Sequence, residues 1–150
     1  MNPDEILSKS IEISHVYDSI ATRIFERAKI LRKEHEIDYM QYKQIMDNYY
    51  LPLMNYSSKI LMDTANAMID NMEEYIVQLE DSSNQLMEVS EKLQNSQQIF
   101  KGITFVLASA AALATFVAAP SKITFSAAFG SISGAVKSIS KITDNSESET

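Results

Sequence analysis

The side chains best suited to catalysis are few in this chain. Its histidines are His15 and His35, and Glu12 precedes His15 by three residues, a spacing found in helical di-metal sites. Such a site needs a second Glu-x-x-His pair, but Arg32 stands three residues before His35. Two histidines with scattered serines predict no Ser-His-Asp triad, and the three glycines form no phosphate-binding loop. The sequence therefore predicts no enzyme activity, no cofactor and no metal site.

Composition narrows the choice of protein class further. The 150 residues carry 13 basic and 20 acidic side chains, and the formal charge of −7 disfavours nucleic acid as a partner. Cysteine is absent, so no disulfide framework or thiolate metal site is possible. The first ten residues lack a basic segment followed by an apolar one, and we therefore expect no cleavable secretory signal.

Acidic residues are distributed very unevenly along the chain. Residues 92–143 contain no Asp or Glu, whereas the other 98 residues hold all 20. This stretch encloses two apolar segments, 103–119 and 123–136, which meet at Pro120-Ser121 and so predict a helical hairpin. A carboxylate at the centre of a bilayer is costly, so the exclusion of acids favours contact with a membrane.

The lengths of the two segments leave two interpretations open. A hydrocarbon core of roughly 30 Å requires about 20 helical residues, whereas the segments offer 17 and 14. A hairpin that inserts into lipid and a hairpin buried inside a soluble bundle are both compatible with these lengths. The candidate membrane-contacting residues are the large apolar ones of the hairpin: Ile103, Phe105, Val106, Leu107, Leu113, Phe116, Val117, Ile123, Phe125, Phe129, Ile132 and Val136.

The chain before the hairpin is predicted to be helical throughout. Up to residue 101 it has no glycine and two prolines, which leaves few residues for tight turns. Asn2-Pro3 is a strong helix start, and we expect a helix over residues 3–34. A second helix is expected over residues 37–50, ending or kinking at Leu51-Pro52 because proline lacks an amide donor. The apolar face of the first helix comprises Ile6, Ile13, Tyr17, Ile20, Ile24, Ala28 and Leu31.

A seven-residue repeat of apolar residues follows. It predicts one continuous helix over residues 57–100, about 66 Å long at ~1.5 Å per residue. A helix of that length must pack along the preceding helices or along other copies of itself. Gly102 is a candidate hinge after it. The repeat starts at Ala65, and the candidate self-association residues are Met72, Leu79, Leu86, Leu93 and Phe100, with Gly130 and Gly134 of the hairpin, whose small-xxx-small spacing permits close helix approach.

These elements together predict an all-α fold, a helical bundle with a long heptad-patterned helix and a C-terminal apolar hairpin. Residues 1–100 would form the bundle or stalk, and residues 101–143 a membrane-active hairpin that carries four lysines. Residues 144–150 would form a disordered acidic tail.

The order of these parts resembles a known architecture. A helical stalk running through Leu79, Leu86 and Leu93 into the hairpin at 103–136 resembles α-helical pore-forming toxins of the cytolysin A type. It is also similar to bacterial type III translocators and inclusion-membrane proteins, which pair coiled-coil helices with two closely spaced apolar helices. The resemblance implies a helical protein that carries an apolar segment into a membrane.

The leading functional hypothesis is a membrane-inserting helical protein that self-associates, with permeabilisation of the membrane as a consequence. Its partners would be a lipid membrane and either further copies of itself or another helical protein. It would be membrane-associated, and soluble before insertion. Two alternatives stay open: a membrane-anchored coiled-coil interaction protein, and a soluble helical binding module with the hairpin buried.

Overall fold

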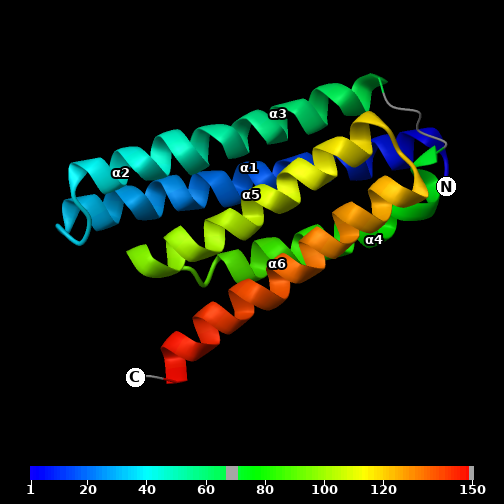
Figure 1. The fold of residues 1–150 in the computed structure, drawn as a ribbon. Helices are drawn as coiled ribbons and strands as arrows, with labels where there is room; N and C mark the ends of the chain where they lie inside the picture. Colours follow the sequence, from blue (N-terminus) through cyan, green and yellow to red (C-terminus); the bar gives the residue numbers. More distant parts are fainter. Residues whose placement is uncertain (67–70, 149–150) are drawn as a thin grey trace.

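The chain folds into long helices that pack side by side (Figure 1). The computed structural model describes the backbone of residues 1–66 and 71–148, with the side chains of residues 1–64 and 71–144. Within these ranges no strand occurs, and the predicted all-α helical bundle is confirmed. The elements are α1 (Pro3–Lys33), α2 (Tyr39–Ile45), the π-helical segment η1 (Met46–Tyr50), α3 (Leu51–Asn66), α4 (Glu73–Ser90), α5 (Ser96–Ala118) and α6 (Lys122–Ser148).

Among the described residues, five long helices form a closed ring around one apolar core. Neighbours in the ring are α1, α3, α5, α6 and α4, which packs back against α1. Figure 1 shows α5 running between α3 and α6, with α4 behind α6. The hairpin of residues 101–143 therefore supplies two adjacent walls of the same bundle to which the first 100 residues belong.

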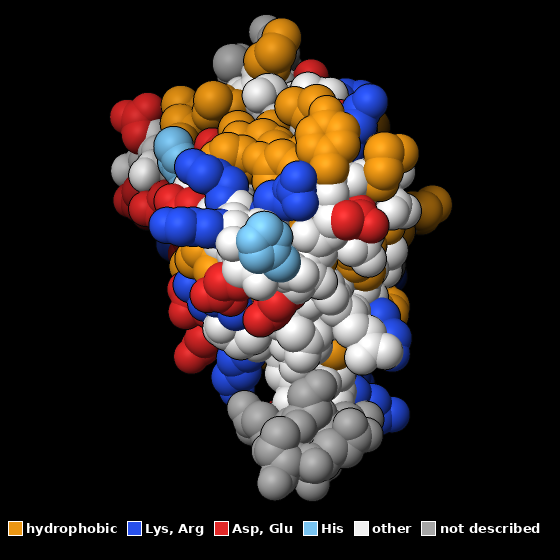
Figure 2. Space-filling view, turned by 90° about the vertical axis from the view of Figure 1, so that its left-hand side faces the viewer, with side chains coloured by type: hydrophobic (Ala, Val, Ile, Leu, Met, Phe, Trp, Pro, Cys, Tyr) orange, Lys and Arg blue, Asp and Glu red, His pale blue; other side chains and the backbone are white. Residues whose placement is uncertain are grey.

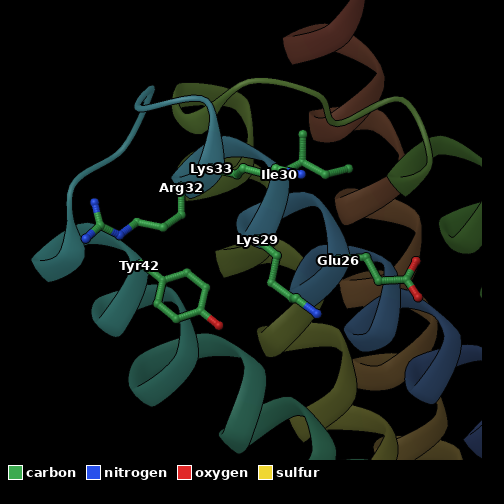
Figure 3. A pocket seen from close by; sticks show the side chains of 6 residues that line it. All are labelled: Glu26, Lys29, Ile30, Arg32, Lys33 and Tyr42. Atoms are coloured by element: carbon green, nitrogen blue, oxygen red, sulfur yellow. The ribbon is translucent and has the colours of Figure 1, made fainter.

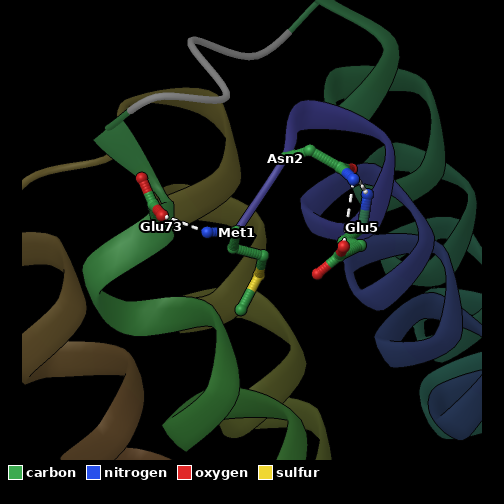
Figure 4. Close-up of polar contacts among 4 residues, drawn as sticks. All are labelled: Met1, Asn2, Glu5 and Glu73. Atoms are coloured by element: carbon green, nitrogen blue, oxygen red, sulfur yellow. Dashed lines mark hydrogen bonds and ion pairs between the residues drawn. The ribbon is translucent and has the colours of Figure 1, made fainter.

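Helix α1 begins as the sequence predicts. The Asn2 side chain accepts a hydrogen bond from the Glu5 amide at 2.9 Å, which caps the helix. The amino group of Met1 lies 2.9 Å from a Glu73 carboxylate oxygen and so links the start of α1 to the start of α4 (Figure 4). The helix ends at Lys33, and every residue of its predicted apolar face is buried.

The sequence predicts a stop or a kink at Leu51-Pro52, and the stop is wrong, because the chain continues through it from α2 into α3. The intervening segment η1 is π-helical, and the Leu51 amide donates to the Met46 carbonyl five residues earlier. Proline has no amide hydrogen, and its ring conflicts with the carbonyl four residues before it in an ordinary α-helix. The wider π-helical turn immediately before Pro52 is how the helix accommodates the proline here.

The predicted continuous helix over residues 57–100 is also wrong. Helix α3 ends at Asn66, α4 starts at Glu73, and a second break separates Ser90 from Ser96. Asn95 causes the second break, because its side chain accepts a hydrogen bond from the Gln98 amide at 2.8 Å and caps α5. Folding back twice lets the chain bury its own apolar repeat. The side chain of Ala65 lies outside the described residues.

Gly102 is not a hinge, since it lies inside the uninterrupted helix α5. It is instead a point of close packing between α5 and the turn before it. A methyl group added at Gly102 would lie 2.9 Å from both terminal carbons of Leu93, which is itself buried. An alanine here would therefore force the Leu93 side chain to shift, so the role of Gly102 is close packing and not backbone freedom.

The predicted hairpin is present, with longer arms than the apolar segments indicated. Its turn is closed by Ser121, whose hydroxyl accepts a hydrogen bond from the Thr124 amide at 3.1 Å and caps α6. The Ser109 hydroxyl on α5 donates to the Ser131 carbonyl on α6 at 3.2 Å, which ties the arms together at mid-length. Helix α6 continues to Ser148, so residues 144–148, predicted to be disordered, are helical.

Candidate functional site: the α5–α6 hairpin

Helix α5 is the one helix among the described residues that is long and apolar enough to cross a membrane. It has 23 residues, and half of its most apolar window is buried inside the bundle. The apolar segment recognised in the sequence, 103–119, has 17 residues. The helix is six residues longer, because it starts at Ser96, seven residues before that segment, and ends at Ala118. Core helices of soluble proteins can be equally long and apolar, so the surroundings of α5 decide how it is interpreted.

The inner face of the hairpin forms much of the bundle core. Six of the twelve predicted membrane-contacting residues are buried there, four are half-buried and two are exposed. The structure therefore brings half of the predicted set together in the core. The buried six are Ile103, Val106, Leu113, Phe116, Val117 and Ile132; the half-buried four are Leu107, Phe125, Phe129 and Val136; the exposed two are Phe105 and Ile123.

An aromatic cluster attaches the closed end of the hairpin to α4. Tyr75 stacks on Phe125 with ring centroids 4.4 Å apart, and it meets Phe116 edge-on at 6.0 Å. Phe129 extends the cluster, 5.6 Å from Phe125. Burial raises the pKa of the Tyr75 hydroxyl, and nearby Glu74 adds to the shift. Sequence reasoning missed this contact, because it placed Tyr75 in a continuous helix that would have carried it far from the hairpin.

The outward side of the hairpin is exposed and uncharged along most of its length. We call this surface the hairpin outer face. Its nearest charges are Lys101, in the second turn of α5, Lys122, the first residue of α6, and Lys137 farther along α6. It consists of Thr104, Phe105, Ala108, Thr115 and Ala118 on α5, and of Ile123, Ser126, Ala127, Gly130 and Gly134 on α6.

The side formed by α1 and α4 is built differently. Lys9 pairs with Glu80 at 3.0 Å across the two helices. Hydrogen bonding and charge repulsion from Glu80 raise the pKa of Glu12. We call the exposed charged residues of these helices the α1–α4 face: Asp4, Glu5, Glu12, Arg23, Glu26, Lys29, Arg32 and Lys33 on α1, and Glu73, Glu74, Asp81 and Glu88 on α4.

The predicted self-association residues fall into two groups. Met72, Leu79, Leu86 and Leu93 are buried in the monomer, and Phe100 is half-buried. Association through this row stays a prediction, and it would require the ring to open. Gly130 and Gly134 are exposed, and a methyl group added at either would meet nothing within 4 Å. This part of α6 is accessible as it stands.

The side chains best suited to catalysis, His15 and His35, do not form a catalytic or metal-binding cluster among the described residues. His15 and His35 are both exposed, and within the described part of the chain no three His, Cys, Asp or Glu side chains are placed to hold a metal ion. The hairpin is therefore the candidate functional site.

Comparisons with protein-family models, with curated proteins and with solved structures find no match to this chain.

Proposed function

We propose that the protein is a helical bundle that inserts its α5–α6 hairpin into a membrane and self-associates there. The observation that carries this proposal is the uncharged hairpin outer face. A helix at the surface of a soluble bundle normally presents charged or strongly polar residues to water. The segment from Gly102 to Ser121 has no charge on either its buried or its exposed side.

The dimensions of the hairpin suit this proposal. The 23 residues of α5 extend about 34 Å at ~1.5 Å per residue, and the uncharged part after Lys101 extends about 26 Å, compared with roughly 30 Å for a hydrocarbon core. The uncharged part of α6 is shorter, but Lys122 and Lys137 bound it. Lysine side chains at such positions extend toward the membrane surface while their methylenes stay in apolar surroundings.

Self-association would follow if the hairpin left the ring of five helices. Removing α5 and α6 would expose the sides of α3 and α4 that now pack against them. An exposed apolar surface of this kind favours association with other copies. Entry of an apolar segment from a helical bundle into a membrane resembles the action of cytolysin A type toxins. In this protein the core of the bundle would supply both the inserting hairpin and the associating surface.

A second candidate is a soluble helical binding module whose hairpin never leaves the core. The burial of Ile103, Val106 and Leu113 at 0% exposure favours it. In that case the hairpin outer face would bind a protein surface, and lipid would have no effect.

Charge placed on the hairpin outer face separates these candidates. Ala108→Glu and Ala127→Glu each add a carboxylate at an exposed position and leave the core intact. A charge at the bilayer centre costs about 3 kcal/mol, or roughly a hundred-fold in affinity. We expect each variant to lose flotation with vesicles that the natural sequence binds.

Ser8→Glu and Thr22→Glu, at exposed positions of α1, are the matched controls and should still float. If the natural sequence does not float, or all four variants float alike, insertion is wrong and the binding module is favoured. Dye release from the same vesicles tests permeabilisation. Binding without release would favour the membrane-anchored interaction protein.

A further inference from the structure

A groove separates the last turns of α1 from α2, at the end of the bundle opposite the hairpin turn. It has a volume of about 620 Å³ and is lined by Glu26, Lys29, Ile30, Arg32, Lys33 and Tyr42. Figure 3 shows the Lys29 and Arg32 side chains on either side of the Tyr42 ring, with Glu26 farther along α1. We call it the α1–α2 groove.

The cations of the α1–α2 groove are available to a ligand. Lys29 lies over the Phe25 ring at 5.2 Å and Arg32 over the Tyr39 ring at 6.0 Å, contacts that leave the positive charges unneutralised. Among the residues that the structure describes, no carboxylate forms an ion pair with Lys29, Arg32 or Lys33. Residues 23–43 carry six basic and four acidic side chains, in a chain whose formal charge is −7.

Exposed apolar side chains surround these cations. Ile30 is 43% exposed, and Tyr39, whose ring Arg32 contacts, is 58% exposed. Figure 2, which views this end of the bundle, shows a hydrophobic area bordered by Lys and Arg side chains. A phosphate would complement the cations, and glycerol and upper acyl carbons would complement the apolar side chains.

The α1–α2 groove also lies where such a ligand would be met. Both the start of α5 and the end of α6 are on the same side of the molecule as the α1–α2 turn (Figure 1). The Arg27 Nε donates to the Gln94 carbonyl at 2.6 Å, which joins α1 to the turn that precedes α5. A hairpin that enters a bilayer with its closed end first would leave this end at the level of the lipid head groups.

We propose that the α1–α2 groove binds the head group of an anionic phospholipid and holds this end of the protein at the membrane surface. The inference rests on the proposed function only in taking a membrane as the partner. Clustered basic residues next to tyrosine are suited to an anionic bilayer surface. An acidic polypeptide would use the cations but not the exposed Ile30 and Tyr39.

Flotation of the full-length protein tests this site. Each basic side chain near an anionic surface contributes about five-fold in affinity. Lys29→Gln with Lys33→Gln should therefore weaken binding to mixed phosphatidylcholine–phosphatidylglycerol vesicles about 25-fold. Binding to phosphatidylcholine vesicles should not change. Lys59→Gln, at an exposed position of α3, is the matched control and should bind both vesicles as the natural sequence does.

Each outcome decides between the proposals. If the double variant and the natural sequence bind the mixed vesicles equally, the lipid site is wrong, even if both release dye through an inserted hairpin. If the double variant binds less and the natural sequence binds without releasing dye, the lipid site stands and pore formation fails. Loss of binding to polyglutamate with unchanged vesicle binding would replace the lipid by an acidic protein.

Discussion

The α1–α4 face and the hairpin outer face cover the same core with opposite kinds of surface. The first presents carboxylates, lysines and arginines along its helices. The second presents alanine, serine, threonine and glycine, with Phe105 and Ile123, between lysines that border it. The inner sides of both are buried in the core, where Leu79, Leu86, Val106 and Leu113 are all at 0% exposure. Packing therefore accounts for the inner sides only, and the difference between the outer sides is what points to function.

The largest expected effect tests whether the heptad row is the core of the monomer. Leu86→Ala should destabilise the bundle by about 2–5 kcal/mol, because it leaves a cavity in the buried core. Val77→Ala, at a partly exposed position of the same helix, should cost much less. Urea denaturation of both variants measures the difference. A dissociated but equally stable Leu86→Ala protein would mean that the row joins subunits instead.

Two glycines of the hairpin sharpen the contrast between its inner and outer sides. Gly134→Ala should stabilise the protein by about 1 kcal/mol, because alanine favours a helix and the added methyl group meets open space. Gly102→Ala should destabilise it, because overpacking against Leu93 costs about 1–3 kcal/mol and exceeds the helix gain.

Thermal unfolding of both glycine variants tests this pair. Leu93→Ala should itself destabilise the protein, because Leu93 is buried, but Gly102→Ala should add no further cost in a Leu93→Ala background, where the methyl group has room. Equal stabilisation by the two alanines would show that Gly102 does not pack closely and would reopen its assignment as a hinge.

A smaller effect tests the break between α4 and α5. Asn95→Ala should lower the free energy of unfolding by about 1 kcal/mol, since it removes the cap of α5. If the helix were continuous through residue 95, alanine would instead stabilise it. Gln97→Ala, at a neighbouring exposed position, is the control, and denaturant titration gives the sign.

The smallest effect concerns the carboxylates of the α1–α4 face. The pKa of Glu12 is raised in the folded protein by Glu80, so the folded state takes up this proton more readily than the unfolded chain. Protonation of Glu12 therefore stabilises the folded state. This stabilisation is complete below the pKa of Glu12 in the unfolded chain and is lost as the pH rises through its pKa in the folded protein. Glu12→Gln should therefore stabilise the bundle at neutral pH and remove this part of its pH dependence. An unchanged pH profile would contradict the Glu12–Glu80 interaction.

The sequence predicts those parts of the fold that depend on local signals. The cap at Asn2, the apolar face of α1 and the turn at Pro120-Ser121 are all local, and all are present. The continuous helix failed because a seven-residue repeat is equally consistent with one helix and with several that fold back on each other. The signal for the break, Asn95 with Gln98 three residues later, is visible in the sequence as a capping box.

The candidate site was predictable as a segment but not as a surface. The absence of acids identified the hairpin. Residues 102–118 of α5 are small or apolar on every side, so the sequence alone does not distinguish the inner face of this helix from its outer face. Tyr75 and the α1–α2 groove depend on contacts between distant helices, and no local pattern predicts them.

The central claim, that the hairpin enters lipid, is tested most directly by a depth measurement at its outer face. The natural sequence has no cysteine, so Ala108→Cys and Thr22→Cys each provide a single site for a fluorophore. Both positions are exposed to water in the bundle. With vesicles that carry quenchers deep in the bilayer, we predict strong quenching of the label at position 108 and none at position 22. Equal, water-like fluorescence at both positions in the presence of bound vesicles would contradict insertion.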